Sequence, residues 1–123
     1  MILRAGLGAT WNVPLVRQVA EVIGYEARLK GIDRGWSPEL QVATDPRFGR
    51  FDESFGECPH LVSHMGVAFA AGLQGGAIGG PDTYANFSAV LTEAKHYGGY
   101  GQVRFLTAIL DDFRRFVDET WRL

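Results

Sequence analysis

Apolar side chains recur at helical spacing in three segments of the chain. The first segment runs from about Val13 to Lys30. Its apolar stripe consists of Leu15, Val16, Val19, Ile23 and Ala27. Asn12 can cap the start of this helix, Pro14 fits its first turn, and Gly31 fits its C-terminal end. These signals together predict one helix with both of its ends defined.

Two more helices are expected further along the chain. Pro59 opens the first of them, and Gly75 and Gly76 stop it. One face of this helix carries Leu61, Met65, Phe69 and Leu73. The last helix is expected from about Val103 to Trp121, with charged side chains opposite an apolar face. That apolar face consists of Phe105, Leu106, Ile109, Leu110, Phe113, Phe116, Val117 and Trp121.

Two short segments between the helices are typical of strands. The first covers residues 35–44, although Pro38 argues that the strand proper begins only after it. Its expected core contributors are Leu40, Val42 and Ala43. The second strand covers residues 88–94. The order helix, strand, helix, strand, helix predicts an α/β fold with a parallel sheet.

Two polar segments, residues 45–57 and 95–101, directly follow the predicted strands. Parallel strands end at one edge of their sheet, and α/β folds bind their ligands at the carboxyl ends of the strands. We therefore expect both segments to lie at the same end of the sheet and to build a site there.

Charge and composition exclude several classes of protein. The formal net charge is −2, so there is no basic field to attract nucleic acid or an anionic membrane. No stretch approaches the roughly 20 apolar residues of a membrane span. Cys58 is the single cysteine, which excludes an internal disulfide. The first residues are too few and too weakly basic for a signal peptide, so we expect none here and leave localisation open.

The polar loop 45–57 crowds charged and aromatic side chains together. Its charged residues are Asp45, Arg47, Arg50, Asp52, Glu53 and Glu57, and its aromatic residues are Phe48, Phe51 and Phe55. Arginine offers a rigid fork of donors for carboxylates or vicinal hydroxyls, and aromatic rings can stack on sugars. The alternative is structural: Asp45, Arg47 and Glu53 tie the loop together through ion pairs. We favour the structural interpretation for these three residues and a functional one for Arg50.

Lys95 and His96 are the second candidate pair, because they offer several donors at the mouth of a strand. The alternative, a lysine reaching solvent and a histidine capping a loop, fits the spacing equally well. His60 and His64 lie one helical turn apart, but no third metal ligand has suitable spacing, so we interpret them as surface residues. The glycines of residues 75–80 do not match a phosphate loop. We expect no metal site and no cofactor.

Several ordered motifs resemble glycoside hydrolase family 3. Residues 45–50 read Asp-Pro-Arg-Phe-Gly-Arg, and residues 53–59 read Glu-Ser-Phe-Gly-Glu-Cys-Pro. They are similar to the family signature D-P-R-[WF]-G-R-x-x-E-[ST]-[FY]-G-E-D-P. Residues 72–75, Gly-Leu-Gln-Gly, and residues 94–97, Ala-Lys-His-Tyr, also fit the family, the latter followed by Tyr-Gly at 100–101. The resemblance covers roughly residues 5–101.

The resemblance implies a fold, an activity and roles for three residues. Members of the family remove β-linked glucose, xylose or related sugars with a (β/α)8 barrel. By resemblance, Arg50, Lys95 and His96 contact hydroxyls of the sugar in the cleavage subsite. The implied partners are a β-linked glucoside or xyloside, the remainder of the barrel and a following domain. Many members are secreted.

The chain also departs from the family pattern. Cys58 stands where an aspartate is usual, which weakens the cap of the following helix. The family's nucleophilic aspartate lies in a Ser-Asp context, and the chain has no Ser-Asp pair. The acid/base carboxylate usually comes from a following domain. We therefore expect a retaining β-glucosidase or β-xylosidase fragment that is inactive alone. Two alternatives stay open: a noncatalytic remnant that binds sugar weakly, and an N-acetylhexosaminidase branch, whose loop fits less well.

The predicted elements do not complete a barrel. Two strands and three helices cannot close an eight-stranded sheet, and open strand edges invite association. We expect residues 1–123 to form a single partial domain, an incomplete (β/α)8 TIM-type barrel that is prone to oligomerise or aggregate.

Overall fold

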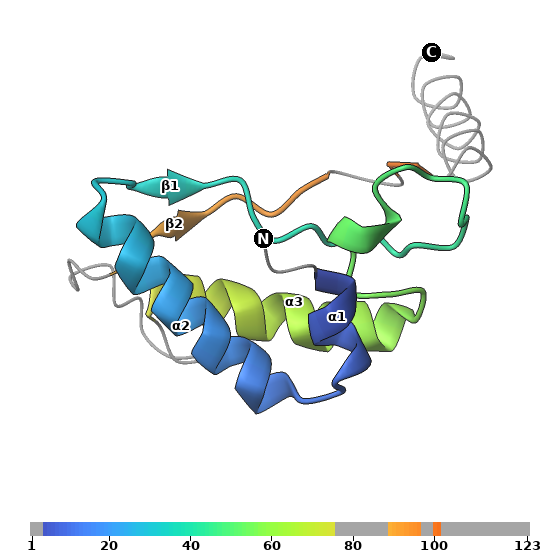
Figure 1. Cartoon of the computed structure of the whole chain (residues 1–123), viewed down its shortest axis with the longest axis horizontal. Coiled ribbons are helices and arrows are strands. Elements are labelled where there is room, and N and C mark those ends of the chain that lie inside the picture. Colours follow the sequence, from blue (N-terminus) through green and yellow to red (C-terminus); the bar gives the residue numbers. More distant parts are fainter. Residues whose placement is uncertain (1–3, 76–88, 97–99, 102–123) are drawn as a thin grey trace, which may run out of the picture.

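The computed structural model describes residues 4–75, 89–96 and 100–101. Two layers make up this part of the chain, with helices on one side and the strands on the other (Figure 1). The elements in chain order are α1 (Arg4–Ala9), α2 (Val13–Leu29), β1 (Arg34–Gly35), the short 3-10 helix η1 (Phe51–Glu53), α3 (Pro59–Gln74) and β2 (Leu91–Thr92). The helix predicted over residues 103–121 lies outside the described residues.

Helix α2 confirms the prediction from capping and periodicity. The Asn12 side chain accepts a hydrogen bond from the Leu15 backbone N–H at 3.0 Å, and Gly31 follows the helix with a φ of 78°. The buried face is narrower than predicted, because Leu15 is 39% exposed. Its fully covered positions are Val16, Ala20 and Gly24. Ala20 and Gly24 are small, which allows α3 to pack closely against this face.

Helix α3 also has the predicted bounds and the predicted buried face. Leu61, Met65, Phe69 and Leu73 are all buried. Gly75 ends the helix with a left-handed φ of 66°, a conformation that glycine adopts without strain. At the other end, Cys58 occupies the cap position and its side chain makes no capping hydrogen bond.

The strands β1 and β2 pair in parallel, with Arg34 opposite Leu91 and Gly35 opposite Thr92. An isolated parallel bridge joins Glu39 to Lys95 further along. The parallel α/β arrangement is therefore confirmed. The prediction that the first strand begins after Pro38 is wrong, because β1 lies before this proline and only the isolated bridge at Glu39 follows it among the described residues. Both strands are also shorter than the predicted 35–44 and 88–94, because the described residues supply each of them with only one neighbouring strand.

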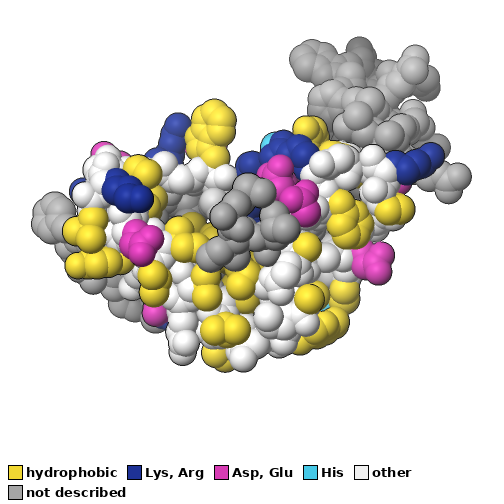
Figure 2. Space-filling model, viewed as in Figure 1, with side chains coloured by type: hydrophobic (Ala, Val, Ile, Leu, Met, Phe, Trp, Pro, Cys, Tyr) yellow, Lys and Arg dark blue, Asp and Glu magenta, His cyan; other side chains and the backbone are white. Residues whose placement is uncertain are grey.

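The two faces of the strand pair differ in their surroundings. Val90 is buried toward the helices, and Thr92 hydrogen-bonds Gln74 of α3. On the opposite face, Trp36 is 69% exposed and Leu91 is 49% exposed. Figure 2 shows apolar side chains at the surface along the strand layer. The described residues thus cover only the helix side of this sheet.

One expected core residue is exposed, and one helix was missed. Leu40 was expected in the core but is 39% exposed, because no described element lies over its outer side. Ala43 is buried and Val42 packs against the core, as expected. Helix α1 was not predicted, since six residues are too few to reveal an apolar period. Among the described residues, no helix has the length and apolarity needed to cross a membrane.

Candidate functional site

The candidate site lies just beyond the carboxyl ends of β1 and β2. It unites the loop around η1 with the segment after β2, although these are far apart in sequence. Arg50, Lys95 and His96 lie together there through contacts with two carboxylates, Glu39 and Glu53. Figure 2 shows basic, acidic and histidine side chains side by side on the upper surface of the molecule.

Arg50 is held by Glu53 in a two-point ion pair. Its Nε and Nη2 donate to the two carboxylate oxygens of Glu53, each at 2.6 Å. The 3-10 turn of η1 makes this possible because it places the residues three positions apart on one side of the chain. The Arg50 hydrogen bonds lower the pKa of Glu53 from 4.5 to about 2, and Glu53 raises the pKa of Arg50. Both groups are therefore charged at neutral pH.

Lys95 joins this pair from the segment after β2. Its Nζ lies 3.6 Å from Oε2 of Glu53, so one carboxylate faces two cations. The Lys95 side chain is 23% exposed, and its ammonium carries three donors, more than the contact with Glu53 uses. Glu53 therefore acts as the link between the loop and the strand end, a position beyond the loop-only role expected from sequence.

Glu39 is the site residue that the sequence analysis missed. It is only 2% exposed and lies beneath the cluster. Its Oε1 and Oε2 lie 3.2 Å and 3.0 Å from Nδ1 of His96, and Oε2 is 4.0 Å from Nη2 of Arg50. Buried carboxylates need charged or hydrogen-bonding partners, and the burial of Glu39 could be seen only in the structure. The available signal in the sequence was a glutamate between apolar neighbours, Pro38 and Leu40.

Tyr100 covers the opposite side of the cluster. Its ring lies 4.2 Å from the His96 ring, and the Arg50 guanidinium lies 5.4 Å from the Tyr100 ring centre. The edge of Phe48 packs on Tyr100 at 5.2 Å. Tyr100 is 41% exposed, so it forms an aromatic wall beside the donors.

The other loop residues lie apart from this cluster. Arg47 pairs with Asp45 through bonds of 2.9 Å and 2.7 Å, and the Arg47 side chain is 88% exposed. The hydrogen bonds from Arg47 lower the pKa of Asp45 to about 2. Phe55 is buried against Phe69 of α3, where it anchors the base of the loop.

His60 and His64 are exposed on α3, with ring centres 4.3 Å apart. No group of three potential metal ligands occurs within residues 4–75, 89–96 and 100–101.

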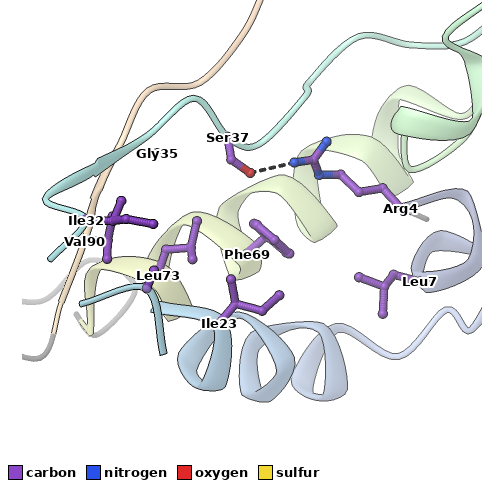
Figure 3. A pocket seen from close by; sticks show the side chains of 10 residues that line it. Arg4, Leu7, Ile23, Ile32, Gly35, Ser37, Phe69, Leu73 and Val90 are labelled. Atoms are coloured by element: carbon purple, nitrogen blue, oxygen red, sulfur yellow. Dashed lines mark hydrogen bonds between the residues drawn. The ribbon is translucent and has the colours of Figure 1, made fainter. Parts of the chain in front are cut away.

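A separate cavity of about 470 Å³ lies between the strands and the helices (Figure 3). Its lining consists of Arg4, Leu7, Ile23, Ala27, Ile32, Gly35, Ser37, Phe69, Leu73 and Val90. Arg4 donates to the Ser37 hydroxyl at 2.7 Å, and burial lowers the pKa of Arg4. The cavity offers few directional polar groups, whereas the Arg50 cluster offers many. The cluster is therefore the better candidate site.

Comparison with known proteins identifies the family of this chain. Residues 3–108 match the model of the glycosyl hydrolase family 3 N terminal domain. The chain belongs to this family. A beta-xylosidase of Formosa agariphila is 43% identical over 97 residues, covering 78% of this chain and 13% of that protein. A periplasmic beta-glucosidase of Salmonella typhimurium is 39% identical over 98 residues, covering 80% of this chain and 12% of that protein.

Solved structures of the family share the fold of this chain. The crystal structure of a beta-glucosidase from Listeria innocua has a TM-score of 0.73 and 38% identity, covering 81% of this chain and 13% of that one. A mutant of that beta-glucosidase has been solved with laminaribiose, at a TM-score of 0.74 and 36% identity over 80% of this chain and 13% of that one. The chain thus spans only a small part of the length of these relatives.

Proposed function

We propose that the chain forms part of the sugar-binding barrel of a retaining, exo-acting β-glycosidase of β-glucosidase or β-xylosidase type. In this proposal residues 1–123 are a single partial domain, an incomplete (β/α)8 barrel. Arg50, Lys95 and His96 hold hydroxyl groups of the sugar in the cleavage subsite. The names of the family relatives, beta-xylosidase and beta-glucosidase, support the choice of substrate.

One observation carries the proposal: three nitrogen donors from two distant segments meet beyond the carboxyl ends of parallel strands. Neutral sugars have no net charge, so proteins recognise them through many directional hydrogen bonds. Leaving one such group unpaired costs about 1–3 kcal/mol. The carboxylates of Glu39 and Glu53 orient these donors, and the Tyr100 ring adds an apolar surface beside them.

The orientation of the strands supports the barrel. In a (β/α)8 barrel the helices cover the outside, and the opposite face of the strands lines the interior. Trp36 and Leu91 are on the face away from α2 and α3, and both are exposed. Further strands of the intact barrel would cover this face.

The chemistry would be divided between this chain and the rest of the protein. An aspartate carboxylate attacks the anomeric carbon while a carboxylic acid protonates the leaving oxygen, and water then hydrolyses the glycosyl-enzyme. Residues outside this chain would supply both carboxylates. Hydrogen bonds between the sugar hydroxyls and Arg50, Lys95 and His96 would favour the flattened ring of the transition state where their positions fit that shape better than the chair. The alternative is a noncatalytic remnant that only binds sugar weakly.

A titration with methyl β-D-glucopyranoside and methyl β-D-xylopyranoside tests the sugar-binding part. We expect amide and side-chain NMR signals of the Arg50 cluster to shift, and Arg50→Ala to weaken binding about tenfold through the loss of a charged donor. Arg47→Ala is the matched control, because it removes an exposed arginine of the same loop and should leave binding unchanged.

The same samples should release no aryl alcohol from an aryl β-glucoside. Hydrolysis of the aryl β-glucoside that is lost in Arg50→Ala would contradict the proposal that both catalytic carboxylates lie outside this chain. Equal binding by both arginine variants would overturn the proposed site.

A further inference from the structure

We propose that Glu39 is a positioning residue that fixes the tautomer and the orientation of His96, and so decides which ring nitrogen faces the substrate. This inference rests on the proposed function for its use in sugar binding. Its physical core, the contact between the Glu39 carboxylate and the His96 ring, stands on the geometry alone.

Burial makes this contact more specific than a surface ion pair. Glu39 is 2% exposed, whereas His96 is 31% exposed. A carboxylate without water must find its hydrogen bonds inside the protein. Nδ1 of His96 lies at hydrogen-bond distance, 3.2 Å, from Oε1 of Glu39, and 3.0 Å from Oε2, which makes an ion-pair contact but no hydrogen bond among the described residues. Nη2 of Arg50 lies farther from Glu39, 4.0 Å from Oε2.

Two arginines interact with the Glu39 carboxylate. Nη2 of Arg50 lies 4.0 Å from Oε2 of Glu39, and the charge of Arg4 in α1 also acts on Glu39. Glu53, the other carboxylate, is already occupied by Arg50 and Lys95. Glu53 thus contacts the arginine and the lysine, and Glu39 contacts the histidine.

An ionised carboxylate can only accept hydrogen bonds, so Nδ1 must carry a proton. In neutral His96 the proton on Nδ1 leaves Nε2 with a free lone pair. Tyr100 packs on the ring with an interplanar angle of 43°, which restrains rotation of the imidazole. Nε2 is therefore the nitrogen presented to a sugar hydroxyl. It accepts a hydrogen bond when His96 is neutral and donates one when His96 is protonated.

The test reads the tautomer directly. Long-range proton–nitrogen NMR correlations on the full chain, at a pH where histidine is neutral, identify the nitrogen that carries the proton. We expect Nδ1–H in the unmodified chain. Glu39→Gln should keep this tautomer, because the amide oxygen still accepts from Nδ1. Glu39→Leu should lose it, because leucine offers no acceptor, and the proton should move to Nε2.

Glu93→Gln is the matched control. It removes a carboxylate from an exposed ion pair with Arg34 and should leave the His96 tautomer unchanged. A proton on Nε2 in the unmodified chain would overturn the inference, and this measurement needs no variant to fold. An unchanged tautomer in folded Glu39→Leu would overturn it as well.

The sugar titration separates this inference from the proposed function. If Nδ1 carries the proton and the chain binds no glycoside, the proposed function fails while the role of Glu39 toward His96 stands. If glycosides bind with His96 in the other tautomer, the inference fails and the proposed function stands. If Nδ1 carries the proton and the chain also binds glycosides, Glu39→Leu should weaken glycoside binding several-fold, and Glu39→Gln should weaken it less.

Discussion

At the scale of single residues, the pairing of Arg50 with Glu53 makes stability depend on pH. The pKa of Glu53 falls from 4.5 to about 2 in the folded chain, and the hydrogen bonds from Arg50 are the main cause. A carboxyl group with a lowered folded pKa stabilises the fold above its unfolded pKa, and this contribution disappears as the pH falls. We expect it to be complete above pH 4.5 and lost progressively toward pH 2.

Urea unfolding across this pH window checks the prediction. Glu53→Gln should be less stable than the unmodified chain above pH 4.5, and the difference should shrink toward pH 2. The exposure of the pair, about a third for each side chain, keeps the effect small. A difference that does not change with pH would contradict the pairing.

Part of the site could be predicted from sequence at this scale. Arg50, Lys95 and His96 follow predicted strands and match family motifs, so their common location could be expected. Glu39 could not be assigned from the sequence, because its partner in the buried contact is His96, which follows only after η1, α3 and β2. The position of Glu53 between Arg50 and Lys95 likewise depends on how the loop returns over the strand ends.

At the scale of elements, the contact between α2 and α3 depends on glycine at position 72. A Cβ on Gly72 would lie 2.5 Å from the Arg17 carbonyl oxygen and 2.7 Å from the Ala20 Cβ. We therefore expect Gly72→Ala to lower the free energy of unfolding by about 1–3 kcal/mol through overpacking. Chemical unfolding followed by circular dichroism measures this change.

Gly6→Ala in α1 is the control, because a Cβ there meets no atom within 4 Å. The better helix propensity of alanine should leave the chain equally stable or more stable by up to about 1 kcal/mol. Equal stability of the Gly72→Ala variant would show that the two helices do not pack as closely as described.

Helices were more predictable than strands for a physical reason. The bounds of α2 and α3 follow from caps, prolines and glycines that act locally. Strand length depends on neighbouring strands, so β1 and β2 have only two residues each where longer strands were expected. Leu40 is exposed for the same reason.

At the scale of the whole molecule, the uncovered strand face should cause self-association. Trp36 and Leu91 are both exposed on this face, and open edges of a sheet favour pairing between chains. We expect sedimentation velocity to detect larger species as the concentration rises. The double variant Trp36→Ser, Leu91→Thr should shift the population toward monomer.

Val22 and Tyr25 provide the control, since they are similarly exposed but lie on the outer side of α2. Their replacement by serine should leave the association unchanged. If both pairs of substitutions act equally, the strand face is not the contact surface.

The proposed site as a whole, Arg50, Lys95 and His96, holds a sugar ring. Intermolecular NOEs between methyl β-D-glucopyranoside and the chain locate the bound sugar. We expect NOEs from the sugar to the rings of His96 and Tyr100, whose centres lie 4.2 Å apart. NOEs confined to the apolar cavity, at Phe69 and Leu73, would contradict it.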